Sequence, residues 1–374
     1  RFGVSVRMLG ATIFLLLRLL WMAVIVYATS DKVLVPLLSL DAPAATPMVC
    51  AVLGVVTVIY TSLGGLRAVV LTDVIQTAIL FGGAILALFT ITNSLGGVAA
   101  WWPQRWPEHW AEPRFGFETD ARVTLGWAMV SAFTWFVCTS ASDQMAIQRY
   151  LATRDVRSAR RAYVTALVSD ALVTALLAVL GLALFAYFQA NPQHITAGDP
   201  IHQSADRLFP RFIVLGLPVG ITGLVTAGLM AAAMSSLSSG MNSSCAVITT
   251  DFLEKLRPDV FSENPLRAAR SVSVCIGVAV VALSVFVSSA SGNLLEVAFK
   301  VVNLFVVPLF ILFFMAMFVP WATTFGVWAA AFCSSMTAIL IAYWPLFGFY
   351  AEVAAPSFLL IMPGFLIVGV VVGP

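Results

Sequence analysis

Apolar segments alternate with short polar ones along the whole chain. Each apolar segment holds about 20 residues, which is the length that an α-helix needs to cross a hydrocarbon core of about 30 Å. A transmembrane β-barrel would instead show segments of about ten residues in which apolar and polar positions alternate, and no such segment occurs. The pattern predicts ten helices, the sixth long enough to continue into water. They lie at about residues 8–29, 46–62, 68–93, 122–150 (interrupted), 163–189, 209–249, 270–289, 293–318, 321–346 and 353–373.

Composition also indicates a polytopic membrane protein. Hydrophobic residues make up 60% of the chain and charged residues 10%, whereas about a quarter of the residues of a soluble domain are charged. The formal net charge of +2 is too small to indicate a nucleic-acid partner. An odd number of cysteines in apolar segments predicts neither disulfides nor a metal site, so we interpret them as small core residues. They are Cys50, Cys138, Cys245, Cys275 and Cys333.

The basic residues predict how the chain is oriented, because cytoplasmic loops carry an excess of Lys and Arg. With the amino-terminal end inside and alternating helices, twelve basic residues fall inside and six outside. The inside set is Arg1, Arg7, Arg67, Arg149, Arg154, Arg157, Arg160, Arg161, Lys255, Arg257, Arg267 and Arg270. The outside set is Lys32, Arg105, Arg114, Arg122, Arg207 and Arg211. The loop WWPQRWPEHW (101–110) then lies outside, as an aromatic anchor at the membrane interface or as a lid over a substrate.

Catalytic patterns at membrane depth do not occur in the sequence. The histidines, His109, His194 and His202, fall in the loops predicted to lie outside. There is no G-x-S-x-G or H-E-x-x-H run. We therefore expect no enzyme, no catalytic residue and no organic cofactor.

The segment VIYTSLGGLRAVVLTDVIQTAIL (58–80) places a carboxylate beside a predicted turn. Gly64–Gly65 predicts the turn between two helices, and Asp73 with Gln76 opens the second helix. A carboxylate near a helix N-terminus is favourable for the helix dipole alone, by about 0.3–1 kcal/mol. Ionisable residues at membrane depth also usually face water or a partner. The residues leave both interpretations of Asp73 open, a structural one and a cation-handling one.

A second polar segment, WFVCTSASDQMAIQRYLATRDVRSARR, interrupts the fourth predicted helix. Its polar residues include Thr139, Ser140, Ser142, Asp143 and Gln144. Hydroxyl groups can satisfy backbone groups that an unwound turn frees, and transporters tolerate such a turn where it lines a cavity. The alternative is a helix that ends early, with Asp143 in the inner headgroup region. The arginines that follow are most simply a positive-inside anchor.

The third polar segment, MAAAMSSLSSGMNSS (230–244), offers both packing and ligands. Small residues recur every four positions, which predicts close helix packing. They are Gly228, Ala232, Ser236, Gly240 and Ser244. This stripe does not explain Ser235 beside Ser236. An alkali cation takes about five or six oxygen ligands, and these two hydroxyls with the carbonyl of Ala232 would offer three. Packing and a cation site both stay open, and the remaining oxygens would have to come from another helix.

Other charges within the predicted spans are interpreted as structural. Arg18 and Asp170 can snorkel or pair, and Glu296 and Lys300 are spaced i, i+4 on one helix face.

Taken together, three segments resemble the sodium/solute symporter family. YTSLGGLRAVVLTDVIQT resembles its signature segment, SDQMAIQRYLATRD its cytoplasmic motif, and GLMAAAMSSLSSGMNSSCAVITTDF its eighth core helix. The resemblance implies the LeuT-type fold, with two inverted five-helix repeats and helices broken at mid-membrane. It implies a single transmembrane transporter domain over residues 1–374, a bacterial-type fragment without the first two core helices. Core helices three to ten would lie at about 1–318 and peripheral helices at about 319–374.

The same resemblance implies roles for particular residues. The sodium ligands would be the carbonyl of Ala232 and the hydroxyls of Ser235 and Ser236, and Asp73 would lie on the ion's route to the inside. The substrate cavity or gate would include Thr139, Ser140, Ser142, Asp143 and Gln144. Thr139 stands where the sugar-transporting branch has a gating aromatic residue, so a sugar substrate is less expected.

The function that the resemblance implies is sodium-coupled symport of a small organic solute by alternating access. Expected partners are the sodium ion, the solute and the lipid bilayer, with no nucleic acid and an open oligomeric state. The expected location is the bacterial inner (cell) membrane, with the Arg-rich loops cytoplasmic. A transport-dead membrane sensor and a proton-coupled symporter are the alternatives with the same fold; the serine pair at 235–236 favours sodium over the proton.

Overall fold

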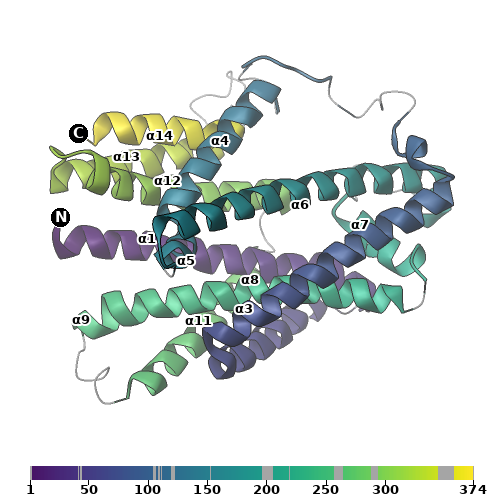
Figure 1. The fold of residues 1–374 in the computed structure, drawn as a ribbon, viewed down its shortest axis with the longest axis horizontal. Helices are drawn as coiled ribbons and strands as arrows, with labels where there is room; N and C mark the ends of the chain where they lie inside the picture. The colour runs from purple at the N-terminus through teal and green to yellow at the C-terminus, as the bar shows by residue number, and fades with distance from the viewer. Residues whose placement is uncertain are drawn as a thin grey trace.

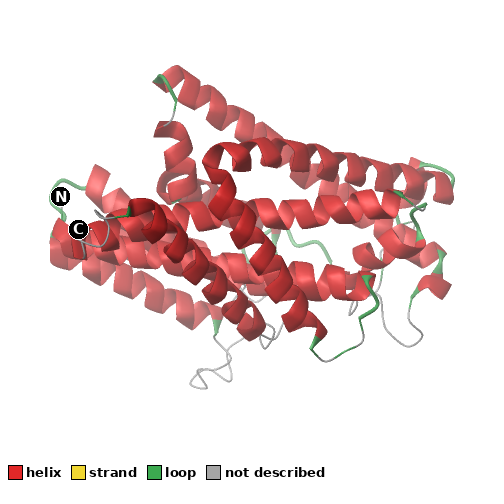
Figure 2. Ribbon diagram, turned by 90° about the horizontal axis from the view of Figure 1, so that it is seen from below, coloured by secondary structure: helices red, strands yellow, loops and turns green. Residues whose placement is uncertain are grey.

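A computed structural model describes residues 2–40, 42, 44–103, 107, 110, 112–118, 123–151, 153–195, 205–218, 220–256, 264–287, 294–343 and 358–373. Within these ranges every regular element is a helix (Figure 2). This agrees with the all-α class predicted from the hydrophobic pattern.

The helices follow one another with short connections, and Figure 1 labels the main ones. The first is α1 (Gly3–Tyr27), which continues through the π-helix η1 (Ala28–Leu34) into α2 (Val35–Leu37). The others are α3 (Ala45–Leu95), η2 (Val98–Trp101), α4 (Leu125–Ser142), α5 (Gln144–Leu151), α6 (Val156–Ala190), η3 (Pro192–His194), α7 (Ala205–Leu215), α8 (Ile221–Val247), the π-helix η4 (Ile248–Leu253), α9 (Glu254–Leu256), α11 (Pro265–Val287), α12 (Leu294–Phe318), α13 (Thr324–Ala342), η7 (Phe358–Leu360) and α14 (Ile361–Val372).

In the described part of the chain, 8 helical segments are long and apolar enough to cross a membrane. Two shorter apolar segments, Val302–Phe318 and Ile361–Val372, complete a set that corresponds to the ten predicted spans. Large apolar side chains point outward from several of them; Phe133 is 71% exposed and Phe286 78%. Lipid is a favourable environment for such side chains, so the chain is a multi-pass membrane protein.

The helices predicted at 46–62 and 68–93 form one continuous element, α3. Helical backbone runs through Gly64–Gly65, and the spans on either side, Ala45–Ser62 and Asp73–Leu95, correspond to the two predicted helices. A glycine inside a helix costs only about 1 kcal/mol relative to alanine, and the apolar segments on both sides favour the helix. The real end comes at Gly96, whose φ of 79° is a left-handed conformation that glycine adopts without strain.

Although α3 is continuous, its contacts indicate a bend between its two spans. Tyr60 and Asp73 both hydrogen-bond to α8, at the successive residues Met234 and Ser235. A straight helix would separate residues 13 positions apart by about 20 Å. The bend brings side chains from both spans of α3 to the same turn of α8.

The helix predicted over 209–249 is divided into α7 and α8, which is a second correction. α7 ends at Leu215 and α8 begins at Ile221. Pro218 lies in the connection, where it lacks an N–H and disfavours helix at the residue before it. Gly220 follows with a φ of 93°. The apolar pattern alone did not reveal this break because apolar residues continue on both sides of it.

α1 lies at the centre of the fold, between two groups of helices. On one side it packs against α12, and α13 and α14 cover α12; these helices lie together at the upper left of Figure 1. On the other side α1 contacts α8 and α11, which pack on α3. Buried Phe188 and Phe212 join α6 and α7 to the far part of α3. Side chains of α1 can therefore contact both groups.

The amino terminus of α6 is capped by a carboxylate outside the span. The side chain of Asp155 accepts a hydrogen bond from the backbone N–H of Ser158 at 2.6 Å. This bond holds the pKa of the Asp155 carboxyl below its ordinary value, as expected for a helix N-cap.

Candidate ion and solute site

The structure joins two of the predicted site residues, Asp73 of α3 and Ser235 of α8. The hydroxyl of Ser235 donates a hydrogen bond to Oδ1 of Asp73. One residue earlier on α8, the carbonyl of Met234 accepts a hydrogen bond of 2.6 Å from the hydroxyl of Tyr60. The hydroxyl of Ser238 donates to the carbonyl of Ser235 at 3.0 Å. Two side chains of α3 thus meet one turn of α8, in the middle of the span Ile221–Leu253.

The other two predicted ligands on α8 are the carbonyl of Ala232 and the hydroxyl of Ser236. Ser236 is exposed and Ala232 is partly exposed. The stripe of small residues packs closely at its two glycines: a Cβ added at Gly228 would lie 3.1 Å from Cγ2 of Ile79, and one at Gly240 would lie 2.7 Å from Sδ of Met22. Residues four apart are rotated by about 40° relative to each other, so the two glycines face different helices, and Ser236 between them is exposed.

Several oxygen atoms near these contacts are buried without a hydrogen-bond partner. They are Oγ1 of Thr61 and Oγ of Ser62, which follow Tyr60, and Oε1 of Gln76, which lies one turn after Asp73. Buried polar atoms normally find a partner in the protein or in ordered water. These three oxygens lie on the turns of α3 that hold Tyr60 and Asp73, and ordered water commonly satisfies such groups.

The interruption predicted in the fourth helix is confirmed, and it is centred on Asp143. α4 ends at Ser142, Asp143 is extended with φ −72° and ψ 117°, and α5 begins at Gln144. The hydroxyls of Thr139 and Ser142 donate to the carbonyls of Trp135 and Cys138, each at 2.7 Å, within intact helix.

The other predicted cavity residues lie at the same break. Ser140 faces Tyr163 of α6, with 3.3 Å between their hydroxyl oxygens. The side chain of Gln144 lies outside the described residues. The hydroxyls of Thr139 and Ser142 therefore bond to the last turns of α4 rather than to an unwound segment.

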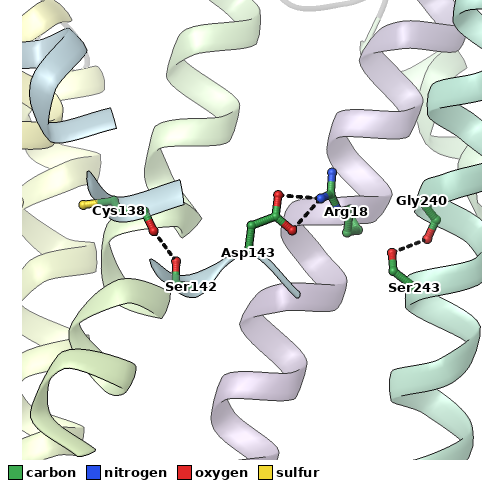
Figure 3. A network of polar contacts seen from close by, with 6 residues as sticks. All are labelled: Arg18, Cys138, Ser142, Asp143, Gly240 and Ser243. Carbon is green, nitrogen blue, oxygen red and sulfur yellow. Dashed lines mark hydrogen bonds and ion pairs between the residues drawn. The ribbon is translucent and has the colours of Figure 1, made fainter. Parts of the chain in front are cut away.

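Asp143 forms an ion pair with Arg18 of α1 (Figure 3). Both carboxylate oxygens accept from Nη2 of Arg18, each at 2.7 Å. The side chains of Arg18 and Asp143 are 10% and 28% exposed, and the guanidinium also lies 5.8 Å from the centre of the Phe14 ring. Such a pair is stable in a poorly hydrated place only when its geometry is good. It fixes the α4–α5 break to the central helix.

α1 therefore links the two polar groups. Arg18 binds the α4–α5 break, and Met22, one turn further on, packs against Gly240 of α8. Sequence reasoning noted Arg18 and Asp143 separately and did not pair them. It also missed Tyr60, because a tyrosine at the end of an apolar segment is ordinarily an interfacial anchor.

Hydroxyls, a carboxylate and a broken helix within apolar helices are features of helical secondary-transporter folds. The chain belongs to the sodium:solute symporter family, whose sequence model matches residues 1–336.

Known proteins agree with this assignment. The sodium/sialic acid symporter NanT of Aliivibrio fischeri is 29% identical over 324 residues, covering 85% of this chain and 62% of that protein. The sodium-dependent multivitamin transporter of Oryctolagus cuniculus is 27% identical over 353 residues, covering 92% of this chain and 52% of that protein. The chain thus spans only about half to three fifths of the length of these relatives.

A solved structure gives the fold. It is the substrate-bound outward-open state of a Na+-coupled sialic acid symporter, with a TM-score of 0.76 and 24% sequence identity, covering 100% of this chain and 74% of that one. The LeuT-type architecture implied by the sequence motifs is thereby confirmed.

Proposed function

We propose that the protein is a sodium-coupled symporter that moves a small organic solute by alternating access. The observation that carries this proposal is the hydrogen bond between Ser235 of α8 and Asp73 of α3. It brings a hydroxyl and a carboxylate from two spans together in a family whose relatives are named as sodium symporters. A transporter of this kind needs no catalytic residue and no organic cofactor.

The proposed sodium ligands are the hydroxyls of Ser235 and Ser236 and the carbonyl of Ala232. Hard cations take oxygen ligands, and the exposure of Ser236 leaves that face of α8 open to further oxygens. Asp73 is proposed to lie on the ion's route to the inside. The unpartnered oxygens of Thr61 and Gln76 support a hydrated path beside it.

The proposed solute cavity lies beside the α4–α5 break, with Thr139, Ser140, Ser142, Asp143 and Gln144 as its candidate residues. The names of two relatives include sialic acid and multivitamins, which supports a small polar organic solute. In the proposed cycle, bound sodium stabilises the outward-open state, and its entry is worth about 2.3 kcal/mol per charge per 100 mV of membrane potential. We further propose one transmembrane domain, in a bacterial inner membrane with the Arg-rich loops cytoplasmic.

Sodium binding can be tested without knowing the solute. A ligand that binds the native state raises its stability, by about 2.7 kcal/mol at a concentration 100 times Kd. We expect sodium chloride to raise the melting temperature of the detergent-solubilised protein above that in choline chloride. Ser235→Ala combined with Ser236→Ala should abolish this difference. Ser243→Ala is the matched control, because the Ser243 hydroxyl bonds within α8 to the carbonyl of Gly240.

Transport itself is measured as uptake of a panel of small solutes into proteoliposomes. Uptake should require an inward sodium gradient, and Asp73→Asn should lower turnover or sodium affinity. Full sodium dependence in the double serine variant would contradict the proposed ligands. Uptake driven by a proton gradient alone would favour a proton-coupled symporter, and sodium binding with no uptake of any solute would favour a sensor.

A further inference from the structure

A groove of about 660 Å³ lies on the side of α11 that faces α1 and η4, away from the site described above. Its walls are Leu19 of α1, Ile248 and Leu253 of η4, and one face of α11. The α11 residues are Asn264, just before the helix, and Arg267, Ala268, Ser271, Val272, Cys275, Ile276 and Ala279. In Figure 1 the start of α11 lies below α9 at the lower left. None of these residues has a role in the proposed transport cycle.

The groove changes from polar to apolar along the axis of α11. Asn264, Arg267 and Ser271 line its outer end and are exposed. Ile276 and Ala279, with Leu19 of α1, line its deeper end. From Arg267 to Ala279 the helix rises about 18 Å, which is close to half of a hydrocarbon core of about 30 Å. The groove therefore matches one leaflet in length and in the direction of its polarity.

The polar end carries positive charge. Arg267 and Arg270 are both exposed on the first turns of α11. Among the described carboxylates, none forms an ion pair with either arginine. An exposed guanidinium above an apolar groove complements an anionic group attached to a hydrocarbon chain.

We propose that this groove binds one anionic phospholipid. Its phosphate lies at Arg267, with the amide of Asn264 and the hydroxyl of Ser271 as hydrogen-bonding groups. One acyl chain lies along α11 against Leu19 and Ile276. Basic pockets between helices on the cytoplasmic side are typical binding places for anionic headgroups, and the proposed orientation puts this end of α11 in the cytoplasmic leaflet. The lipid would hold η4 and α11, and thus the end of α8, in a fixed relation.

Cys275 makes the groove testable, because it is exposed and lines the middle of the groove. Its alkylation by a maleimide is followed in detergent-solubilised protein, with Cys275→Ser identifying its share of the signal. Palmitoyl-oleoyl-phosphatidylglycerol should slow alkylation about fivefold relative to the same mole fraction of phosphatidylcholine. A fivefold ratio corresponds to about 1 kcal/mol, which is the contribution of one Lys or Arg near an anionic membrane surface.

Two variants distinguish lipid binding in the groove from a general effect of positive charge on the alkylation rate. Arg267→Gln should remove the difference between the lipids, whereas Arg160→Gln, at an exposed arginine of α6, should keep it. Equal alkylation rates with both lipids, or loss of the difference in Arg160→Gln, would overturn the proposal. So would protection of Cys275 before any lipid is added, since another protein segment or a second copy would then cover the groove. Because the readout is alkylation, its outcome is independent of sodium binding and uptake.

Discussion

Arg18 illustrates how one side chain can determine the geometry of a membrane site. An arginine cannot lose its proton in a protein, so its charge within a span must be balanced locally. Asp143 provides this balance through two hydrogen bonds of 2.7 Å. Because Asp143 is also the residue at which α4 stops and α5 starts, the ion pair fixes the position of the helix break.

This pair predicts a strongly non-additive effect on stability. Removing one partner of a buried ion pair costs about 3–5 kcal/mol, and we expect the lower end because Asp143 is 28% exposed. Asp143→Asn should lower the free energy of unfolding more than Arg18→Met does, because Asp143→Asn leaves the more deeply buried guanidinium without its ion-pair partner. The double variant should recover most of the loss. The measurement is thermal and denaturant unfolding in detergent, analysed as a double-mutant cycle.

A second ion pair of α1 serves as the control. Arg7 pairs with Asp251, and their side chains are 54% and 17% exposed. Since the guanidinium of Arg7 is far better hydrated than that of Arg18, Arg7→Met should change stability less than Arg18→Met. If the effects of Arg18→Met and Asp143→Asn simply added, or if Arg7→Met were equally damaging, the pair would not have the role assigned to it.

At the residue scale, sequence reasoning identified groups but not partners. Asp73, Ser235 and Asp143 each stood out because polar residues are rare in apolar segments. That Asp73 meets Ser235, 162 positions later, depends on how α3 packs on α8, and no local pattern encodes it. Tyr60 and Arg18 were unrecognised as partners for the same reason.

At the element scale, close contact between α3 and α11 depends on two glycines. A Cβ added at Gly277 of α11 would overlap Cγ2 of Val58, and one at Gly54 of α3 would overlap Cγ2 of Val281. The arrangement is reciprocal, with each helix placing a valine against a glycine of the other. Small residues allow such approach in membranes, where packing rather than hydrophobicity drives association.

Gly277→Ala is therefore expected to destabilise the protein by about 1–3 kcal/mol, the usual range for overpacking. Valine is branched at Cβ and has little rotamer freedom in a helix, so Val58 cannot move aside. Val58→Ala in the same background should restore part of the stability. Gly82→Ala in α3 is the control, because a Cβ there meets nothing within 4 Å. Unfolding in detergent gives the comparison, and equal losses for both alanine variants would contradict this account.

The elements also separate what the sequence predicts from what it does not. Hydrophobic runs located the spans well, since length and composition alone define them. The continuity of α3 and the division between α7 and α8 were both missed. Glycine is compatible with either a turn or a helix: the backbone is helical through Gly64–Gly65, whereas Gly220 has a φ of 93°.

At the scale of the whole molecule, α1 is the structural link between the two polar groups. It binds the α4–α5 break through Arg18 and packs on α8 through Met22. A tilt of α1 would change its contacts with the α4–α5 break and its contacts with α8 at the same time. In the proposed transport cycle, this arrangement would couple the accessibility of the proposed ion site to that of the proposed solute cavity.

Orientation across the membrane is the property of the whole molecule that the basic residues predict. We expect a cysteine at Arg114, in the loop before α4, to react with a membrane-impermeant maleimide in intact cells. A cysteine at Arg157, at the start of α6, should react only after the membrane is permeabilised. Both substitutions are at exposed side chains and are made in a Cys275→Ser background. The physical reason is the excess of Lys and Arg that retains loops in the cytoplasm. The reverse pattern, or labelling of both positions in intact cells, would contradict the predicted topology and with it the inward direction of the proposed sodium-coupled transport.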